Sequence, residues 1–223
     1  MFSSTVSSAT GAPVPMLIRR RLRVPLALAL ATAALSATGA APATAEPRPA
    51  PTPPSNYDWR PDVSIQKRLN YAYEVQATSY WCSAAAARIA LSVRGRFIRQ
   101  EHLASRMRVS SSIGLPNIAN LAEALNHYTN SNYYEVKDLN NDAALRSSLR
   151  SDVLVNVRNG HAVVINVKRI ATATFDGHYA TIVGYRKAGY EYLVSDPASA
   201  SRKSIWLTAE DVVSSIKLHR YVA

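Results

Sequence analysis

The sequence predicts an α+β fold in which helices come first along the chain and an antiparallel sheet follows. Three segments have the apolar spacing of helices, at residues 82–93, 99–107 and 116–127. Nearer the carboxyl end, residues 178–186 and 190–195 are two β-rich runs separated by a short loop with a glycine, the pattern of a hairpin. Because helices and strands are segregated along the chain, we expect the α+β class.

The first predicted helix begins at the only cysteine of the sequence, Cys82. Ala85, Ala86 and Ile89 lie three, four and seven residues after it, which is one face of a helix. A thiol in the first turn lies at the positive end of the helix dipole, which favours the thiolate. Gln76, six residues upstream, can bring an amide donor to the same point and form half of an oxyanion hole.

The next two helices are supported by their apolar residues and their ends. Residues 99–107 place Leu103 inward, and residues 116–127 carry an apolar stripe that includes Leu121 and Leu125. Pro116 suits the start of the second of these helices, because a proline there lacks only an N–H group that would be unpaired anyway.

Residues 141–168 allow two interpretations. Leu145, Leu149 and Val153 have helical spacing and predict a helix that ends near Asn159-Gly160, followed by a strand at residues 162–167. The same stretch also fits a hairpin that turns at Asn159-Gly160. We prefer the helix followed by a strand.

The remaining elements are assigned from shorter signals. Residues 69–75 alternate as a short strand or extended segment, and Asp196-Pro197 ends the second hairpin strand because proline cannot donate to a sheet. Further along we expect a strand at residues 204–206, a short helix at 208–216 opened by a capping box, and a closing strand at 216–222.

The first 45 residues resemble an export signal. Four arginines between positions 19 and 23 precede an apolar run at 24–35, and Ala43-Thr44-Ala45 fits a signal-peptidase cleavage site. A membrane anchor is the alternative, but the apolar run is shorter than the ~20 residues that a span needs. We therefore expect a signal peptide at 1–45, a proline-rich linker at 46–56, one domain at 57–223, and a secreted, extracellular protein without a stable membrane anchor.

Charge and cysteine content narrow the class of protein. The net charge is +11, and four of the positive charges belong to the predicted signal. No dense run of Lys and Arg follows the predicted signal, so nucleic acid is not expected as a partner. The excess of positive charge does predict weak association with anionic cell-wall polymer. The single cysteine is an intermolecular bridge, a reactive thiol or a small buried apolar residue. One cysteine and scattered histidines lack the spacing of a metal site, and no cofactor is expected.

A cysteine nucleophile needs a base, and five histidines are candidates. Four of them fall on solvated helix faces, in a loop or in the terminal strand: His102, His127, His161 and His219. If Arg186 faces Tyr190 across the hairpin loop, Ala180 faces Asp196, and His178 lies diagonal to Asp196 on the same face, within reach of contact. A surface ion pair between His178 and Asp196 is the alternative, and Asp176 competes for the same histidine.

Three motifs occur together in this chain: Gln76 with Cys82-Ser83-Ala84-Ala85, the segment 177–185, and Val194-Ser195-Asp196-Pro197. Together they resemble the papain-like cysteine peptidases, and in particular the bacteriocin-leader-processing (double-glycine) family and its secreted relatives. The resemblance implies a papain-like fold, with N-terminal helices packed on a C-terminal antiparallel sheet, and a peptide or protein substrate. It also implies Cys82 as nucleophile, His178 as base, Asp196 as orienting group and Gln76 at the oxyanion hole.

Two departures limit this resemblance. Many relatives have Gly-Pro after the cysteine, where this chain has Ser83-Ala84. The leader-processing members sit on membrane transporters, so cleavage after double glycine is not carried over. A secreted cysteine peptidase is the main hypothesis. The alternatives are an amidase or transglutaminase-type acyl transferase of the same fold, and a non-catalytic binding module.

Overall fold

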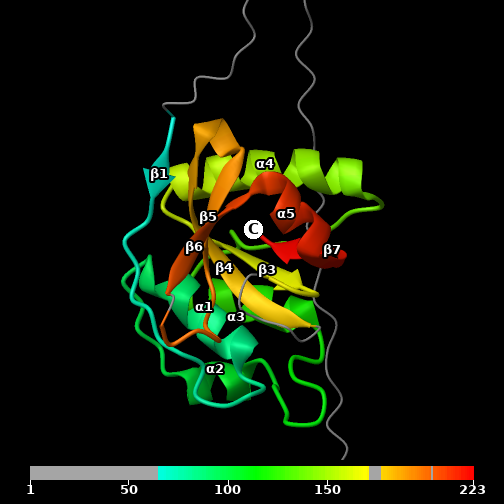
Figure 1. Cartoon of the computed structure of the whole chain (residues 1–223). Helices are drawn as coiled ribbons and strands as arrows, with labels where there is room; N and C mark the ends of the chain where they lie inside the picture. Colours follow the sequence, from blue (N-terminus) through cyan, green and yellow to red (C-terminus); the bar gives the residue numbers. More distant parts are fainter. Residues whose placement is uncertain (1–64, 171–176, 202) are drawn as a thin grey trace, which may run out of the picture. The chain divides into compact units, whose positions relative to one another are not determined.

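A computed structural model of the chain describes residues 65–170, 177–201 and 203–223 (Figure 1). The predicted signal peptide (1–45), the linker (46–56) and the competing carboxylate Asp176 lie outside the described residues. Within the described ranges, no helix has the length and apolar character that a membrane span requires.

The helices of the described residues lie close to their predicted places. Their bounds are α1 Cys82–Ser92, α2 Gln100–Arg106, α3 Ile118–Thr129, α4 Asp142–Arg158 and α5 Ala209–Ser215. Asn141 caps α4, its side-chain oxygen accepting from the Ala144 amide at 2.9 Å, and the helix ends at Asn159. The helix interpretation of this stretch is therefore confirmed, and the hairpin alternative is wrong.

The strands form one antiparallel sheet. Their bounds are β1 Lys67–Arg68, β2 Val136–Asp138, β3 Val163–Val167, β4 His178–Arg186, β5 Glu191–Ser195, β6 Ser204–Thr208 and β7 Ile216–Val222. The spatial order is β2-β7-β3-β4-β5-β6, and β1 pairs with β4 off this path. The α+β class with helices packed on an antiparallel sheet is confirmed. Sequence analysis did not predict the three-residue β2. Among the described residues before α1 (65–81), only Lys67–Arg68 form a regular strand.

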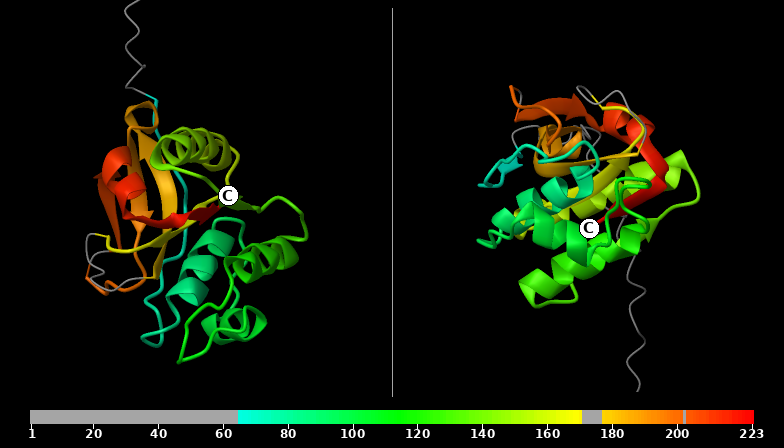
Figure 2. Two further views of the ribbon diagram at one scale, coloured as in Figure 1. Left: turned by 90° about the vertical axis from the view of Figure 1, so that its right-hand side faces the viewer. Right: turned by 90° about the horizontal axis from the view of Figure 1, so that it is seen from below.

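Strand β4 runs through the centre of this sheet and carries the site. Eight of its nine residues are buried, which requires cover on both of its faces. Both α1 and α4 pack against β3 and β4, and Figures 1 and 2 show α4 well separated from α1. Four consecutive alanines, Ala84–Ala87, let α1 lie close to β4, where the Thr181 hydroxyl donates to the Ala86 carbonyl at 3.0 Å.

The hairpin of β4 and β5 differs from the prediction at its tip and agrees with it at the site. Arg186 pairs with Glu191 and not with Tyr190, because the loop, which includes the 3₁₀ turn Lys187–Gly189, is one residue longer than expected. The register shifts between Ile182 and Gly184, and beyond that bulge Thr181 pairs with Ser195. This restores the predicted pairing, which brings Ala180 level with Asp196.

Candidate active site

Cys82 is the first residue of α1 and is nearly buried. Trp81 precedes it at the N-cap and provides no side-chain hydrogen bond to the helix, so the first N–H groups of α1 remain available to a ligand. Cys82 lines a cavity of about 320 Å³ together with Tyr179, Asn166 and Lys217. The thiol therefore lies at a helix start that opens on a cavity.

His178 is the first residue of β4 and has no solvent exposure. Gly177 precedes it with a φ of 82°, a backbone conformation that residues with a side chain rarely adopt. The ring Nε2 donates to Asp196 Oδ1 at 2.6 Å, and the ring lies close enough to the Cys82 side chain for the two to interact electrostatically. Because Nε2 is taken by Asp196, Nδ1 is the ring nitrogen left for the thiol.

Two opposing effects set the pKa of His178. Burial is the largest and lowers the pKa, because it disfavours the charged ring. The hydrogen bond and charge of Asp196, together with the neighbouring Cys82 side chain, outweigh burial and raise the pKa to about 9. The ring is therefore an imidazolium at neutral pH, beside the Asp196 carboxylate and near the Cys82 sulfur.

Asp196 is held by its own turn and by a distant tyrosine. Its Oδ1 also accepts from the Ala198 amide at 2.9 Å, and the side chain is almost fully buried. The hydroxyl of Tyr73 donates to the backbone carbonyls of Asp196, at 2.9 Å, and of Ser199. Burial, followed by the charge of Asp196, raises the pKa of Tyr73. Sequence analysis placed Tyr73 only in an alternating segment and gave no sign of this contact.

Gln76 lies in the cavity adjacent to the one that contains Cys82. This second cavity, of about 370 Å³, is lined by Gln76, Thr78 and Ala198, and Ser79 lines both cavities. The Gln76 amide nitrogen donates to the Thr78 carbonyl at 2.8 Å, and its backbone N–H donates to the Pro197 carbonyl at 2.9 Å. A primary amide has two N–H groups, so the bond to Thr78 leaves one for a substrate.

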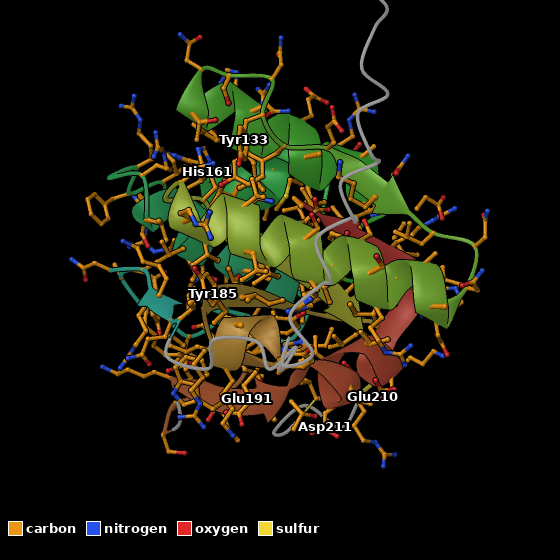
Figure 3. All side chains as sticks on the ribbon, turned by 90° about the horizontal axis from the view of Figure 1, so that it is seen from above. Tyr133, His161, Tyr185, Glu191, Glu210 and Asp211 are labelled. Carbon is orange, nitrogen blue, oxygen red and sulfur yellow. The ribbon has the colours of Figure 1, made fainter. Side chains whose placement is uncertain are left out.

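The other histidines lie outside this cluster. His161 stacks on Tyr133 with ring centroids 3.7 Å apart, and Figure 3 shows the two near one end of α4. Burial, followed by the charge of Arg94, lowers the pKa of His161. His219 contacts Asp142 at 2.9 Å, while His102 and His127 are exposed. The described residues contain no group of His, Cys, Asp and Glu that could hold a metal ion.

The geometry agrees with the comparison to known families. The family described as Peptidase_C39 like family matches residues 68–221, which include the cysteine, the histidine and the aspartate. The chain belongs to the Peptidase_C39 like family. This C39-like protein is thus an enzyme, a cysteine-type peptidase with a papain-like fold, and its substrates are peptides or proteins.

Two solved structures are similar to this C39-like peptidase. The peptidase domain of Streptococcus ComA, a bi-functional ABC transporter involved in a quorum-sensing pathway, is 15% identical with a TM-score of 0.50. The match covers 69% of this chain and 97% of that domain, and it shows a shared fold. Bromelain from Ananas comosus, in complex with the inhibitor E64, is 12% identical with a TM-score of 0.42, over 70% of this chain and 93% of bromelain. No curated protein sequence matches this chain.

Proposed function

We propose that this C39-like peptidase hydrolyses peptide bonds with Cys82 as nucleophile, His178 as general base and acid, and Asp196 as the group that orients His178. The observation that carries the proposal is the buried pair of His178 and Asp196 beside a thiol at the start of α1. This arrangement supplies a nucleophile, a base next to it and an orienting group hydrogen-bonded to the base.

The reaction follows from the charges of these groups. The Cys82 sulfur attacks the carbonyl carbon of the scissile bond, and the carbonyl oxygen becomes an oxyanion. Cleavage of the C–N bond leaves a thioester, and His178 gives its proton to the departing amine. Water then attacks the thioester while His178 accepts a proton. Cleavage of the C–S bond releases the carboxylic acid and restores the thiolate.

Gln76 is proposed as one oxyanion donor, and the backbone N–H of Cys82 as the other. The Cys82 amide belongs to the first turn of α1, where no carbonyl of the helix can reach it. The second N–H of the Gln76 amide is the donor not used by Thr78. Two such donors stabilise the charge that develops on the substrate oxygen.

An extended peptide fits the cavities around Cys82. A third cavity, of about 370 Å³, is lined by Ile118, Leu218 and Arg220. It shares Tyr179 and three other residues with the Cys82 cavity, which shares Ser79 with the Gln76 cavity. The three cavities thus adjoin, with the thiol in the middle one, and an elongated substrate can occupy them together.

We also propose that the enzyme acts outside the cell. The support is the sequence of residues 1–45, with its arginines, apolar run and Ala43-Thr44-Ala45. The excess of basic residues in the remaining chain supports weak association with anionic cell-wall polymer.

The test is incubation of the purified protein with a mixture of unstructured peptides, followed by mass spectrometry with and without an added primary amine. Hydrolysis gives peptides with new carboxyl termini, and the Cys82→Ser variant gives none. Products joined to the amine would instead identify an acyl transferase. Intact peptides in every sample would contradict the peptidase proposal.

A further inference from the structure

Gln100, the first residue of α2, has a buried polar side chain that takes no part in the proposed reaction. It is 2% exposed, although glutamine is mostly found on protein surfaces. Its amide makes three hydrogen bonds: Oε1 accepts from the Ala77 N–H at 2.9 Å, and Nε2 donates to the Val75 carbonyl at 2.8 Å and to the Glu74 carboxylate at 2.6 Å. Every bond of this amide therefore goes to the segment that leads to Cys82.

These bonds hold the backbone on both sides of Gln76. In an extended segment, the carbonyl of one residue and the N–H of the second residue after it point to the same edge. The Gln100 amide bonds to the Val75 carbonyl and the Ala77 N–H, which form such a pair, in the way that a neighbouring strand would. The N–H of Gln76 belongs to the opposite edge and donates to the Pro197 carbonyl. Gln76 is thus fixed between Gln100 and the turn that carries Asp196.

The same network ties this segment to the helix of the nucleophile. Glu74, which accepts from Gln100, forms an ion pair with Arg88 of α1 at 2.5 Å. Arg88 in turn donates to the Ile98 carbonyl, just before α2, at 2.6 Å. The position of Gln76 is therefore set relative to α1, which begins at Cys82, and not only relative to α2.

We propose that Gln100 is a positioning residue, which places the Gln76 amide for the oxyanion. The inference rests on the proposed function, in which Gln76 is an oxyanion donor. Gln100 touches no reacting atom, so its effect passes through Gln76. A donor has to lie within about 2.7–3.1 Å of the oxyanion, so a small displacement of its backbone weakens catalysis more than it weakens substrate binding.

Asn126 of α3 provides a matched control. Its amide also pairs with backbone, donating to the Tyr134 carbonyl at 2.8 Å and accepting from the Tyr134 N–H at 2.8 Å. This bond pair joins α3 to the segment before β2, and neither partner lines the cavities around Cys82. Replacing Asn126 removes two side-chain-to-backbone hydrogen bonds, as replacing Gln100 does for Val75 and Ala77, but leaves the segment around Gln76 unchanged.

The experiment compares Gln100→Met with Asn126→Leu, both close in size to the residue they replace. Gln100→Met lowers kcat by about 10²-fold with KM changed less than about threefold, as expected for misplacement of a catalytic group. Cys82 alkylation keeps its wild-type rate, because the thiol and His178 remain in place. In a Gln76→Ala background, Gln100→Met causes little further loss, because both changes remove the same donor. Asn126→Leu lowers the melting temperature but leaves kcat unchanged.

Hydrogen exchange at the Gln76 and Ala77 amides measures positioning without any substrate. It becomes faster in Gln100→Met and in the milder Gln100→Asn, and stays as in wild type in Asn126→Leu. Unchanged exchange in both Gln100 variants would overturn the inference, as would an undiminished kcat or full additivity with Gln76→Ala. A wild-type protein that cleaves no peptide would instead remove the proposed function, and hydrogen exchange alone would then decide whether Gln100 holds the segment.

Discussion

The Nε2 atom of His178 lies 2.6 Å from Oδ1 of Asp196, in a pair with almost no exposure to solvent. The two residues are eighteen positions apart, and they meet at the open end of one hairpin, because His178 begins β4 and Asp196 directly follows β5. An exposed ion pair would add little to stability or chemistry, whereas this buried pair fixes the orientation and charge of the ring that faces Cys82. The surface alternative considered for the sequence is therefore wrong.

The first prediction concerns the reactivity of the thiol. A charged His178 stabilises the thiolate, which is the species that reacts with iodoacetamide. We expect rapid alkylation of Cys82 at mildly acidic pH, a strong decrease in His178→Ala and a smaller one in Asp196→Asn. The measurement is the alkylation rate between pH 5 and pH 8 by mass spectrometry. Slow alkylation of the folded protein in all variants would point to a structural cysteine.

The second prediction concerns stability and pH. The pKa of His178 is raised from an ordinary value near 6.5 to about 9 in the folded protein, so folding favours the protonated ring. The resulting stabilisation is fully present below pH 6.5 and is lost as the pH rises through 9. The difference in melting temperature between wild type and His178→Gln should be largest near pH 6 and smallest above pH 9. A difference that grows with pH would contradict this account.

The third prediction separates the proposed oxyanion donor, Gln76, from the proposed triad of Cys82, His178 and Asp196. Gln76→Ala should lower kcat by about 10²–10³-fold, the usual effect of losing one oxyanion donor. Alkylation of Cys82 should hardly change, because no oxyanion forms in that reaction. Steady-state kinetics and alkylation rates measured on the same preparation provide the check. A loss of alkylation equal to that in His178→Ala would show that Gln76 acts on the thiolate instead.

The fourth prediction concerns the turn that carries Asp196. Tyr73→Phe removes the hydroxyl that donates to the carbonyls of Asp196 and Ser199. We expect a loss of unfolding free energy of about 1–3 kcal/mol, because buried carbonyls lose their donor. Urea denaturation measures it, and Tyr71→Phe serves as a control of the same chemistry. Equal stability of the two variants would mean that the Tyr73 bonds contribute nothing.

The fifth prediction concerns export. Cleavage after Ala45 should leave Glu46 at the amino terminus of protein recovered from the culture medium. Amino-terminal sequencing of that protein makes the measurement. Protein retained in the cell membrane with residues 1–45 attached would support the anchor that sequence analysis set aside.

The part of the site that sequence reasoning predicted is the part fixed by local geometry. Helical spacing placed Cys82 at the first turn of α1, and pairing arithmetic along one hairpin placed His178 diagonal to Asp196 on the same face. Tyr73 and Gln100 could not be found in this way. The hydrogen-bond partners of Tyr73 lie up to 126 positions away, and the partners of Gln100 lie on a segment with no regular pattern. Both sets of contacts depend on how the helices pack against the sheet. Short β2 lacked the alternation that identifies a strand.

The bulge between Ile182 and Gly184 separates the two ends of the β4 and β5 hairpin. In a regular hairpin, one extra residue in the loop would move every later side chain to the other face of the sheet. Here the strand absorbs that residue before it reaches His178. The loop length at the Lys187–Gly189 turn and the geometry of the His178–Asp196 pair can therefore vary independently during evolution. Relatives with a loop one residue shorter should keep the histidine on the same face and lack the bulge.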